Sequence, residues 1–367
     1  MERYIFGIDI GTTAVKTVLI SSSGRMVDEA TQPHPLIALH TGWAEEDAEV
    51  WWENTVRCIR LINERHPEEM KKVECIGATG MVPAIVVTDG AGKPLRNAIL
   101  QNDVRAVSQI EMLTNTIEQD ELFSLTGGYT NQQHVLPRLL WIRDHEPEVF
   151  ASIVHVFGSY DYINFKLTGK FAVEANWAAE SGLFDIRKKC LLTQQLNRFG
   201  VDPAIFPPLC EIMRVLGAVT PAASQSTGLR SGIPVISGSA DHVASALAAG
   251  IITSGDLLIK FGGAGDILYC TDALVTHERL FFDYHIVPGK YLVNGCMAAS
   301  GSLIRWFLWE TAGNYDKATL RHFDEEAAAL PATGDGLIVL PYFLGEETPL
   351  MDPLSRGTIF GLTLSHT

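Results

Sequence analysis

Two glycine-rich turns and one carboxylate are the parts of this sequence whose residue types and spacing could do chemistry. The first turn contains Gly11, Thr12 and Thr13 and follows Asp9, and the second spans residues 262–265 (GGAG). Each turn lies between two apolar runs, so each is predicted to close a β-hairpin. Because small residues leave the backbone N–H groups accessible, such turns can approach phosphate oxygens. The pair therefore indicates two facing lobes that hold one polyphosphate.

The carboxylate is Asp241, which stands in a run of small residues (GSADHVASA) shortly before the second turn. An apolar-faced helix is predicted over residues 241–249, so Asp241 would lie at the helix N-terminus. It could serve only as the helix cap, but the helix dipole would also favour its ionised form. That form suits a base that takes a proton from a hydroxyl attacking a phosphate. His242 is given no role, because sequence neighbours point apart on a helix.

The composition fits a water-soluble enzyme. A chain of 367 residues is long enough for two domains with ample cores. The net charge of −15 argues against nucleic acid as a partner. No apolar run is long enough to span a membrane, and residues 1–4 lack the features of a signal peptide. The six cysteines have no CxxC spacing, which is typical of reduced thiols, so we expect a cytoplasmic protein.

The predicted elements begin with three short strands and continue with alternating helices and strands. The strands cover residues 4–10, 15–20 and about 26–31. This antiparallel start excludes a Rossmann order of strand, helix, strand. We place a domain boundary at residues 250–255. The later elements are predicted helices at 47–64, 104–114 and 138–145, and predicted strands at 73–78, 84–88 and 233–237.

Seven segments, in this order and at this spacing, resemble the motifs of the FGGY carbohydrate kinases, within the actin/hexokinase/Hsp70 ATPase superfamily. The resemblance implies an α/β protein with the actin-like (ribonuclease H-like) ATPase fold, two lobes around a cleft. Residues 1–250 would form the N-terminal sugar-binding domain and residues 251–367 part of the C-terminal ATP-binding domain. The segments are residues 7–13, 42–46, 101–105, 136–145, 238–241, 342–349 and 356–366.

The resemblance also implies an activity. The protein would transfer the γ-phosphate of ATP to a hydroxyl of a small ketose, D-xylulose being the best single guess, or of a polyol. Asp241 would be the general base, and Asp9 would hold Mg²⁺ through water. Gly263 and Ala264 stand where the family usually has threonine or serine, so the second loop has fewer hydroxyl donors. The phosphate-binding residues would be Gly11, Thr12, Thr13, Gly262, Gly263 and Gly265.

The predicted sugar pocket departs from its relatives. Xylulokinases carry Gln-Met-His where this chain has Met81 and the two residues after it, and Trp-Asn-Asp where it has residues 101–103. Asn102 and Asp103 would still read sugar hydroxyls, although Asn-Asp pairs also favour turns. Trp43 would pack beside the sugar or serve the core. Loss of the Gln and His makes the expected pocket more apolar.

Two other functional classes stay open at this point. One is a non-catalytic sugar sensor on the same fold, which the altered triplet and the weakened second loop favour slightly. The other is an Hsp70-like ATPase that acts on protein partners, although that class lacks the Asn-Asp pocket. The expected partners are a small-molecule sugar and ATP, with no nucleic acid and no membrane. A homodimer is compatible with the sequence.

The family pattern continues beyond the last residues of this sequence. A long helix and a glycine-rich loop that holds adenosine would follow, so the adenine-binding residues are expected beyond Thr367. We therefore expect the second lobe to be incomplete, to expose apolar surface and to bind nucleotide more weakly than a longer chain. The sequence leaves open the sugar, the phosphorylated hydroxyl, the oligomeric state and whether this chain alone is active.

Overall fold

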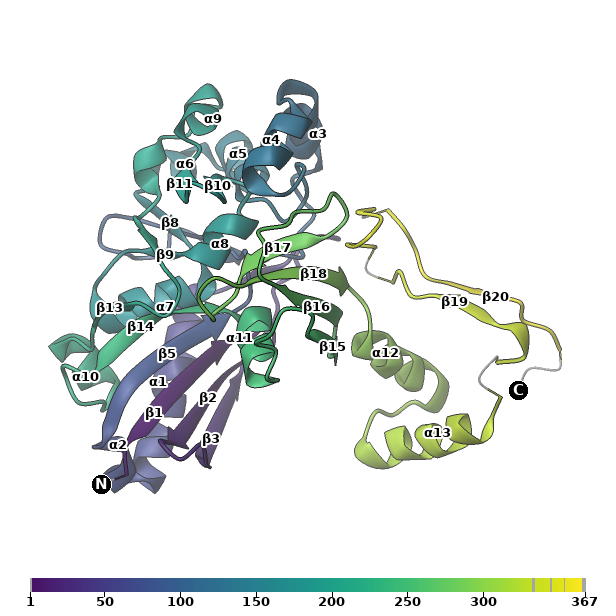
Figure 1. The fold of residues 1–367 in the computed structure, drawn as a ribbon, viewed down its shortest axis with the longest axis horizontal. Helices are drawn as coiled ribbons and strands as arrows, with labels where there is room; N and C mark the ends of the chain where they lie inside the picture. Colours follow the sequence, from purple (N-terminus) through teal and green to yellow (C-terminus); the bar gives the residue numbers. More distant parts are fainter. Residues whose placement is uncertain (1, 332–333, 344, 353, 365–367) are drawn as a thin grey trace.

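The computed structural model describes residues 2–331, 334–343, 345–352 and 354–364. We call the part up to helix α11 the first lobe and the part from strand β15 onward the second lobe (Figure 1). The first lobe is built on a six-stranded sheet in the order β13-β14-β5-β1-β2-β3. Its strands are β1 (Tyr4–Ile10), β2 (Ala14–Ser21), β3 (Met26–Pro33), β5 (Val73–Gly80), β13 (Val215–Ala218) and β14 (Pro234–Ala240).

The sheet combines an antiparallel meander with a parallel centre. β1, β2 and β3 pair antiparallel, while β5 lies parallel to β1 on one side and to β14 on the other. In β1, alternate residues from Tyr4 to Ile10 are buried, which is the period of two that a half-buried strand requires. Ile10, Gly80 and Ala240 are paired across the three parallel strands. These strands therefore end at one edge of the sheet.

Helices cover one face of this sheet. α1 (Ala48–Arg65) packs on β2 and β3, and it also contacts α7 (Ser159–Thr168) and α10 (Pro221–Thr227). It begins where the Asp47 side chain accepts a hydrogen bond from the Glu49 N–H, the usual N-cap arrangement. α11 (Asp241–Ala248) follows directly from β14.

The remaining elements of the first lobe are short. Many of them lie beyond the carboxyl edge of the sheet (Figure 1). The helices are α2 (Pro67–Met70), α3 (Val107–Thr116), α4 (Gln119–Thr126), α5 (Val135–His145), α6 (Pro147–Ser152), α8 (Ala175–Glu180), α9 (Thr193–Arg198) and η1 (Pro203–Ile205). The strands are β4 (Glu45–Glu46), β6 (Val86–Thr88), β7 (Ala98–Ile99), β8 (His155–Phe157), β9 (Val173–Glu174), β10 (Phe184–Asp185), β11 (Cys190–Leu191) and β12 (Leu209–Cys210).

The second lobe contains a four-stranded antiparallel sheet in the order β15-β16-β18-β17. β17 packs against α8 of the first lobe, which joins the two lobes. Figure 1 shows α12, α13 and the β19/β20 ribbon extending from the sheet as an arm. The elements are β15 (Leu257–Phe261), β16 (Gly265–Thr271), β17 (Phe281–Tyr284), β18 (Tyr291–Met297), α12 (Gly301–Ala312), α13 (Lys317–Ala329), η2 (Gly334–Gly336), β19 (Ile338–Leu340) and β20 (Thr358–Phe360).

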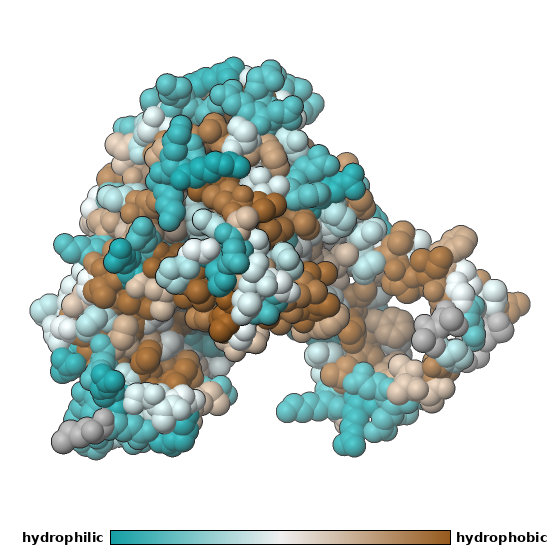
Figure 2. Space-filling view, in the orientation of Figure 1, coloured by the Kyte–Doolittle hydropathy of each residue, from teal (hydrophilic) through white to brown (hydrophobic). Residues whose placement is uncertain are grey.

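One face of the β15/β16 hairpin is apolar and exposed. Leu257 pairs with Tyr269, and Ile259 pairs with Ile267, so all four side chains lie on the same face. Phe261 on that face is 84% exposed. Hydrophobic residues surround the notch between the body of the molecule and the arm (Figure 2). The predicted exposure of apolar surface on the second lobe is confirmed.

The predicted elements are present, with shifted ends. The helix predicted over residues 104–114 begins at Val107 instead, because residues 101–105 wrap around the Asp103 carboxylate. The helix predicted from residue 138 begins at Val135, since Pro137 fits the first helical turn. The boundary at residues 250–255 stays a prediction. In the described part of the chain, no helix is long and apolar enough to cross a membrane.

Candidate active site

The ends of the three parallel strands bring Asp9, Met81 and Asp241 to one edge of the sheet. Asp9 is the last residue but one of β1, and the Met81 N–H donates to the Ile10 carbonyl at 3.1 Å. Asp241 follows β14 as the first residue of α11. In α/β sheets, ligands bind outside the carboxyl ends of parallel strands. This edge is therefore the candidate ligand-binding site of the first lobe.

A single glycine in β14 lets the strand pass close to β5 just before Asp241. Gly238 has φ +78°, and a Cβ there would lie 1.8 Å from the Ala78 carbonyl oxygen. The pairing of β14 with β5 shifts between Ile236 and Ser239 at this point. The Thr79 hydroxyl then donates to the Ser239 carbonyl at 2.7 Å, which fixes the strand again. Only glycine allows this close approach.

The first glycine-rich turn, residues 11–13, is held in place by a buried histidine that sequence reasoning missed. The His34 N–H donates to the Thr13 carbonyl, and His34 Nε2 lies 3.0 Å from the Gly11 carbonyl oxygen. The same Nε2 lies 3.0 Å from Glu46 Oε2, and each of the two side chains is only 1% exposed. Thr12 and Thr13 are exposed. The turn is thus held from below, and its two hydroxyls face outward.

The second glycine-rich turn, residues 262–265, is held by backbone hydrogen bonds from the start of α12. The N–H of Gly301 donates to the Gly262 carbonyl at 2.8 Å, and that of Ser300 to the Gly263 carbonyl at 2.9 Å. Because C=O and N–H of a trans peptide point in opposite directions, the N–H groups of Gly263 and Ala264 point away from α12. They remain suitable for phosphate, whereas Gly265 belongs to β16 and pairs with Phe261 and Met297. Its phosphate contact stays a prediction.

Lysines from both lobes approach the two carboxylates. Lys16 Nζ lies 4.0 Å from Asp9 Oδ2, and Lys260 Nζ of β15 lies 2.6 Å from Asp266 Oδ2. Burial, together with the charge of Asp241, raises the pKa of Asp9 to about 6, although Lys16 and Lys260 act in the opposite direction. The charge of Lys260 acts on both Asp9 and Asp241, and the contact of His242 Nε2 with Asp283 Oδ2 at 3.0 Å joins the two lobes beside Asp241.

These residues fit a magnesium ion. Two carboxylates repel each other where burial already disfavours their charge, so a cation beside Asp9 would relieve both effects. The Asp9 side chain is 34% exposed, and the hydroxyls of Thr12 and Thr13 are nearby in the chain. A single carboxylate in an accessible position suits Mg²⁺, which keeps most of its waters.

Asp241 and His242 contact each other, so the prediction that their side chains point apart was wrong. Asp241 Oδ1 accepts from the His242 N–H at 2.6 Å and lies 3.4 Å from His242 Nδ1. The reason is that Asp241 is the first residue of the helix, after Ala240 at the N-cap, and its side chain folds onto the N–H of the next residue. Burial alone would raise the pKa of Asp241, but His242 and Lys260 outweigh burial and lower it. The lowered pKa favours the ionised carboxylate of Asp241.

Asp103 lies in a separate cluster and has its acceptors occupied. Its carboxylate accepts from the Ala44 N–H at 2.6 Å and from Arg105 Nη2 and Nε at 2.7 and 2.9 Å. The side chain is fully buried, whereas Asn102 is exposed. In this structure Asp103 anchors Arg105, and only Asn102 of the pair presents its side chain to solvent. A sugar contact of either residue stays a prediction.

Trp43 belongs to the same cluster. The Arg105 guanidinium lies 3.9 Å from the centre of the Trp43 ring, in cation–π geometry. The edge of Trp141 packs on Trp43 with ring centres 5.2 Å apart. Met81 is buried at the sheet edge, 2% exposed. The sugar contacts predicted for Trp43 and Met81 stay predictions, and the structure favours a packing role for Trp43.

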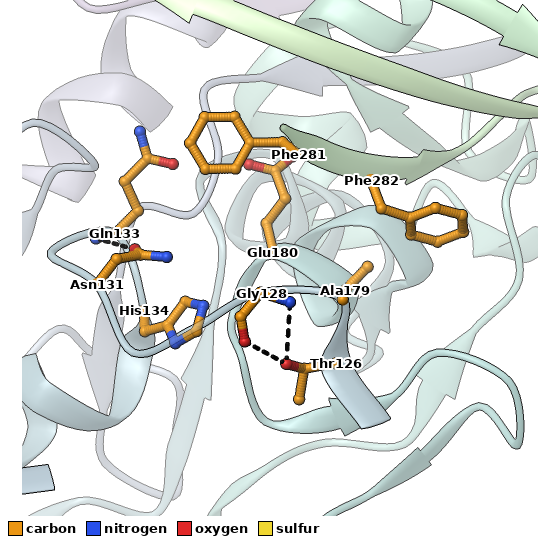
Figure 3. A pocket seen from close by; sticks show the side chains of 10 residues that line it. Thr126, Gly128, Asn131, Gln133, His134, Ala179, Glu180, Phe281 and Phe282 are labelled. Carbon is orange, nitrogen blue, oxygen red and sulfur yellow. Dashed lines mark hydrogen bonds between the residues drawn. The ribbon is translucent and has the colours of Figure 1, made fainter. Parts of the chain in front are cut away.

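Two adjacent cavities between the lobes share lining residues, and they were not predicted as a site, although the motif at residues 342–349 contributes Glu346 and Glu347 to the larger one. The larger has a volume of about 190 Å³ and lies between residues 128–133 of the first lobe and Phe281, Glu346 and Glu347 of the second. The smaller shares Asn131, Gln133 and Phe281 with it and is also lined by Glu180 (Figure 3). Glu180 Oε1 lies 3.6 Å from His242 Nε2. Glu180 therefore lies between the smaller cavity and His242.

Comparison with known sequences shows the family. The model of the N-terminal domain of the FGGY family of carbohydrate kinases matches residues 4–248, and that of the C-terminal domain matches residues 275–367. The chain belongs to the FGGY family of carbohydrate kinases. Kinases of this family use ATP. The predicted family, its actin-like ATPase fold and its sugar phosphotransferase chemistry are confirmed.

Individual relatives agree with this assignment. The xylulose kinase of Bacillus subtilis (strain 168) is 31% identical over 369 residues, which cover 99% of this chain and 72% of the relative. The crystal structure of the xylulose kinase from Rhodospirillum rubrum is 43% identical, with a TM-score of 0.90, and covers 100% of this chain and 74% of its own. The gluconokinase of Bacillus subtilis (strain 168) is 26% identical, over 100% of this chain and 72% of the relative.

Proposed function

We propose that this FGGY kinase transfers the γ-phosphate of ATP to a hydroxyl of a small ketose, and that D-xylulose is the acceptor. The observation that carries the proposal is the position of Asp241. It begins α11 at the sheet edge where Asp9 lies near the end of β1, and His242, together with Lys260 of the second lobe, favours its ionised form. The choice of sugar is supported by the similarity to the xylulose kinase from Rhodospirillum rubrum.

In the proposed reaction Asp241 accepts the proton of the sugar hydroxyl. The hydroxyl oxygen forms a bond to the γ-phosphorus, and the bond from this phosphorus to the bridging oxygen of ADP breaks. Asp9 would hold Mg²⁺, which supplies positive charge to the phosphates. The turns at residues 11–13 and 262–264 would bind phosphate oxygens through N–H groups, and the first turn also through hydroxyls. These donors stabilise charge that develops during transfer.

We place the acceptor sugar in the cavities between the lobes. A volume of about 190 Å³ suits a small sugar, and Asn131 and Gln133 supply polar contacts. The acidic side chains of Glu180, Glu346 and Glu347 line the two cavities. They would repel the carboxylate of gluconate, so the structure favours a neutral sugar over a sugar acid.

The test is an ADP-release assay with a panel of D-xylulose, other ketoses, polyols and gluconate. D-xylulose is expected to give the highest kcat/KM, and gluconate a value at least tenfold lower, which corresponds to about 1.4 kcal/mol of discrimination. A calorimetric titration of each sugar runs in parallel. Sugar binding without ADP release would instead support the sugar-sensing alternative.

We further propose a cytoplasmic location, since all six cysteines are free thiols. The proposed partners are the sugar and ATP alone. A homodimer stays a prediction that sedimentation of the purified chain would test.

A further inference from the structure

His242 lies where the two lobes meet and faces carboxylates from three elements. His242 Nδ1 lies 3.4 Å from Asp241 Oδ1 on α11. His242 Nε2 lies 3.0 Å from Asp283 Oδ2 on β17 and 3.6 Å from Glu180 Oε1 on α8. Asp283 belongs to the second lobe, whereas the other residues belong to the first. The imidazole therefore connects Asp241 directly to the other lobe.

The surroundings favour a charged imidazole. Asp283 is fully buried, the His242 side chain is 15% exposed, and the Glu180 side chain is 10% exposed. Within the described residues, Asp283 Oδ1 and Glu180 Oε1 have no hydrogen-bond partner. Burial alone would lower the pKa of His242, but the carboxylates of Asp283, Asp241 and Glu180 raise it well above its ordinary value. A doubly protonated ring donates through both nitrogens.

The position of Asp283 is fixed by hydrogen bonds on each side. Asn294 of the neighbouring strand β18 donates to Asp283 Oδ2. The next residue, Tyr284, donates its N–H to Asn176 Oδ1 at 2.8 Å, and its carbonyl accepts from Asn176 Nδ2 at 3.1 Å. Asn176 lies on α8 of the first lobe, so these bonds hold β17 against that lobe. The geometry between Asp283 and His242 therefore depends on the lobes being together.

We propose that His242 is a positioning residue for the base Asp241, a charged link whose one nitrogen donates to Asp241 Oδ1 while the other donates to Asp283 Oδ2. The proposal rests on the phosphoryl transfer proposed above. Asp241 Oδ1 is occupied by the His242 backbone N–H and faces the imidazole. Oδ2 is then the oxygen left to accept the sugar proton, and His242 keeps its own proton throughout the reaction.

The link also sets the charge balance at the base. The positive groups that lower the pKa of Asp241 are His242 and Lys260, and burial acts against them. Removing the imidazolium leaves Lys260 alone against burial. Asp241 would then hold a proton at higher pH and would be a base over a narrower range. Separation of the lobes would have the same effect, because it removes Asp283 from His242.

The first test does not depend on turnover. Imidazole signals of the isotope-labelled chain are titrated by NMR in the wild type and in the Asp241→Asn and Asp283→Asn variants, with EDTA present. His242 is expected to titrate above the usual histidine value of about 6.5, and Asp283→Asn is expected to lower that value. Titration of His242 at an ordinary value in the wild type would overturn the link. The link would also be overturned if His242 gave the expected titration only with Zn²⁺ in place of EDTA, because these side chains would then be metal ligands.

The second test compares ADP release across pH. His242→Gln is expected to lower kcat roughly tenfold, less than the hundredfold or greater loss from removing the base, with both KM values changed less than twofold. The acidic limb of the kcat/KM profile is expected to move to higher pH. The matched control is His285→Asn, a buried histidine that hydrogen-bonds the Ile251 carbonyl. His285→Asn should change thermal stability but leave the acidic limb of the kcat/KM profile at the wild-type pH.

The outcomes separate the two proposals. An unchanged acidic limb and kcat in His242→Gln, with wild-type folding by circular dichroism, would overturn the positioning role. If the chain releases no ADP with any sugar, the proposed function fails, and the NMR titration still decides whether His242 is charged and linked to Asp283.

Discussion

Asp9 and Asp241 are two carboxylates at one sheet edge whose surroundings shift their pKa values in opposite directions. Burial raises the pKa of Asp9 to about 6, whereas His242 and Lys260 outweigh partial burial and lower the pKa of Asp241, whose side chain is 42% exposed. A pair of acids with pKa values driven apart is a common basis for divided roles in active sites. Asp9 gains from a cation beside it, and Asp241 is available as a base.

Asp241→Asn is expected to abolish phosphoryl transfer while sugar binding stays nearly intact. An amide cannot accept the hydroxyl proton at neutral pH, and loss of a general base costs roughly a hundredfold to ten-thousandfold in rate. The measurement is kcat at saturating sugar, with calorimetric titration of the sugar. The control is Asp316→Asn, the cap of the exposed helix α13. Wild-type kcat in Asp241→Asn would show that another group is the base.

Asp103→Ala and Asn102→Ala are expected to separate folding from sugar affinity. Removing Asp103 leaves the guanidinium of Arg105 with only part of its partners in a buried site, which costs about 3–5 kcal/mol of stability. Asn102→Ala should leave stability nearly unchanged. Because Asn102 lines neither cavity, a loss of sugar affinity larger than the loss of ATP affinity would move the sugar from the cavities to the side of Asn102. Thermal unfolding and titration of both ligands check this. Equal stability of the two variants would contradict the anchoring role of Asp103.

At the scale of elements, α8 is the helix that joins the lobes. Its N-cap is Glu174, whose Oε2 accepts from the Tyr160 hydroxyl at 2.5 Å and from the Asn176 N–H at 2.9 Å. Asn176 then binds the backbone of β17, and Glu180 ends the helix beside His242. One helix of six residues thus holds the interface and one wall of the cavity.

Glu174→Gln is expected to make stability less dependent on pH. Burial raises the pKa of Glu174 from 4.5 to about 7. The stabilising contribution of its protonated form is therefore complete below about pH 4.5 and is lost as pH rises through about 7. A glutamine keeps the capping acceptor and never ionises, so the variant should gain thermal stability relative to the wild type at pH 8 but not at pH 5. Glu118→Gln, at an exposed site, should show no such difference.

At the scale of the whole molecule, the second lobe differs from the first in how its sheet is covered. The sheet of the first lobe is packed against α1, α7 and other helices, whereas the hairpin β15/β16 exposes the apolar face of Leu257, Ile259 and Ile267. Contiguous exposed apolar surface favours association. The net charge of −15 opposes it by repulsion between molecules.

The chain is therefore expected to self-associate at high concentration and more strongly at high salt, because salt screens the repulsion. The triple variant Leu257→Thr, Ile259→Thr and Ile267→Thr places β-branched threonine, which favours strands, at all three positions and should reduce the association. Met26→Thr, an exposed residue on β3 of the other sheet, is the control and should not. Sedimentation velocity at several concentrations decides, and identical behaviour of wild type and triple variant would show that this face is not responsible.

The local elements and the chemistry class were determined by the sequence itself. Alternation over residues 4–10, glycine-rich turns between apolar runs and the helix start at Asp241 are all patterns of neighbouring residues, and the structure has β1, the hairpins and α11 where these patterns predict them. The order of motifs indicated the family in the same way. Such features depend on backbone preferences within a few residues, so a single sequence contains them.

Contacts between distant residues were decided only by the tertiary structure. The burial of Asp103 against Ala44, the bracing of the first turn by His34, and the approach of His242 to Asp283 each join segments that no local pattern relates. His242 was misjudged because helix geometry describes the interior of a helix, whereas Asp241 and His242 start one. The packing of β17 on α8 places Asp283 beside them, since burial of two apolar surfaces determines how the lobes meet and sequence neighbours do not.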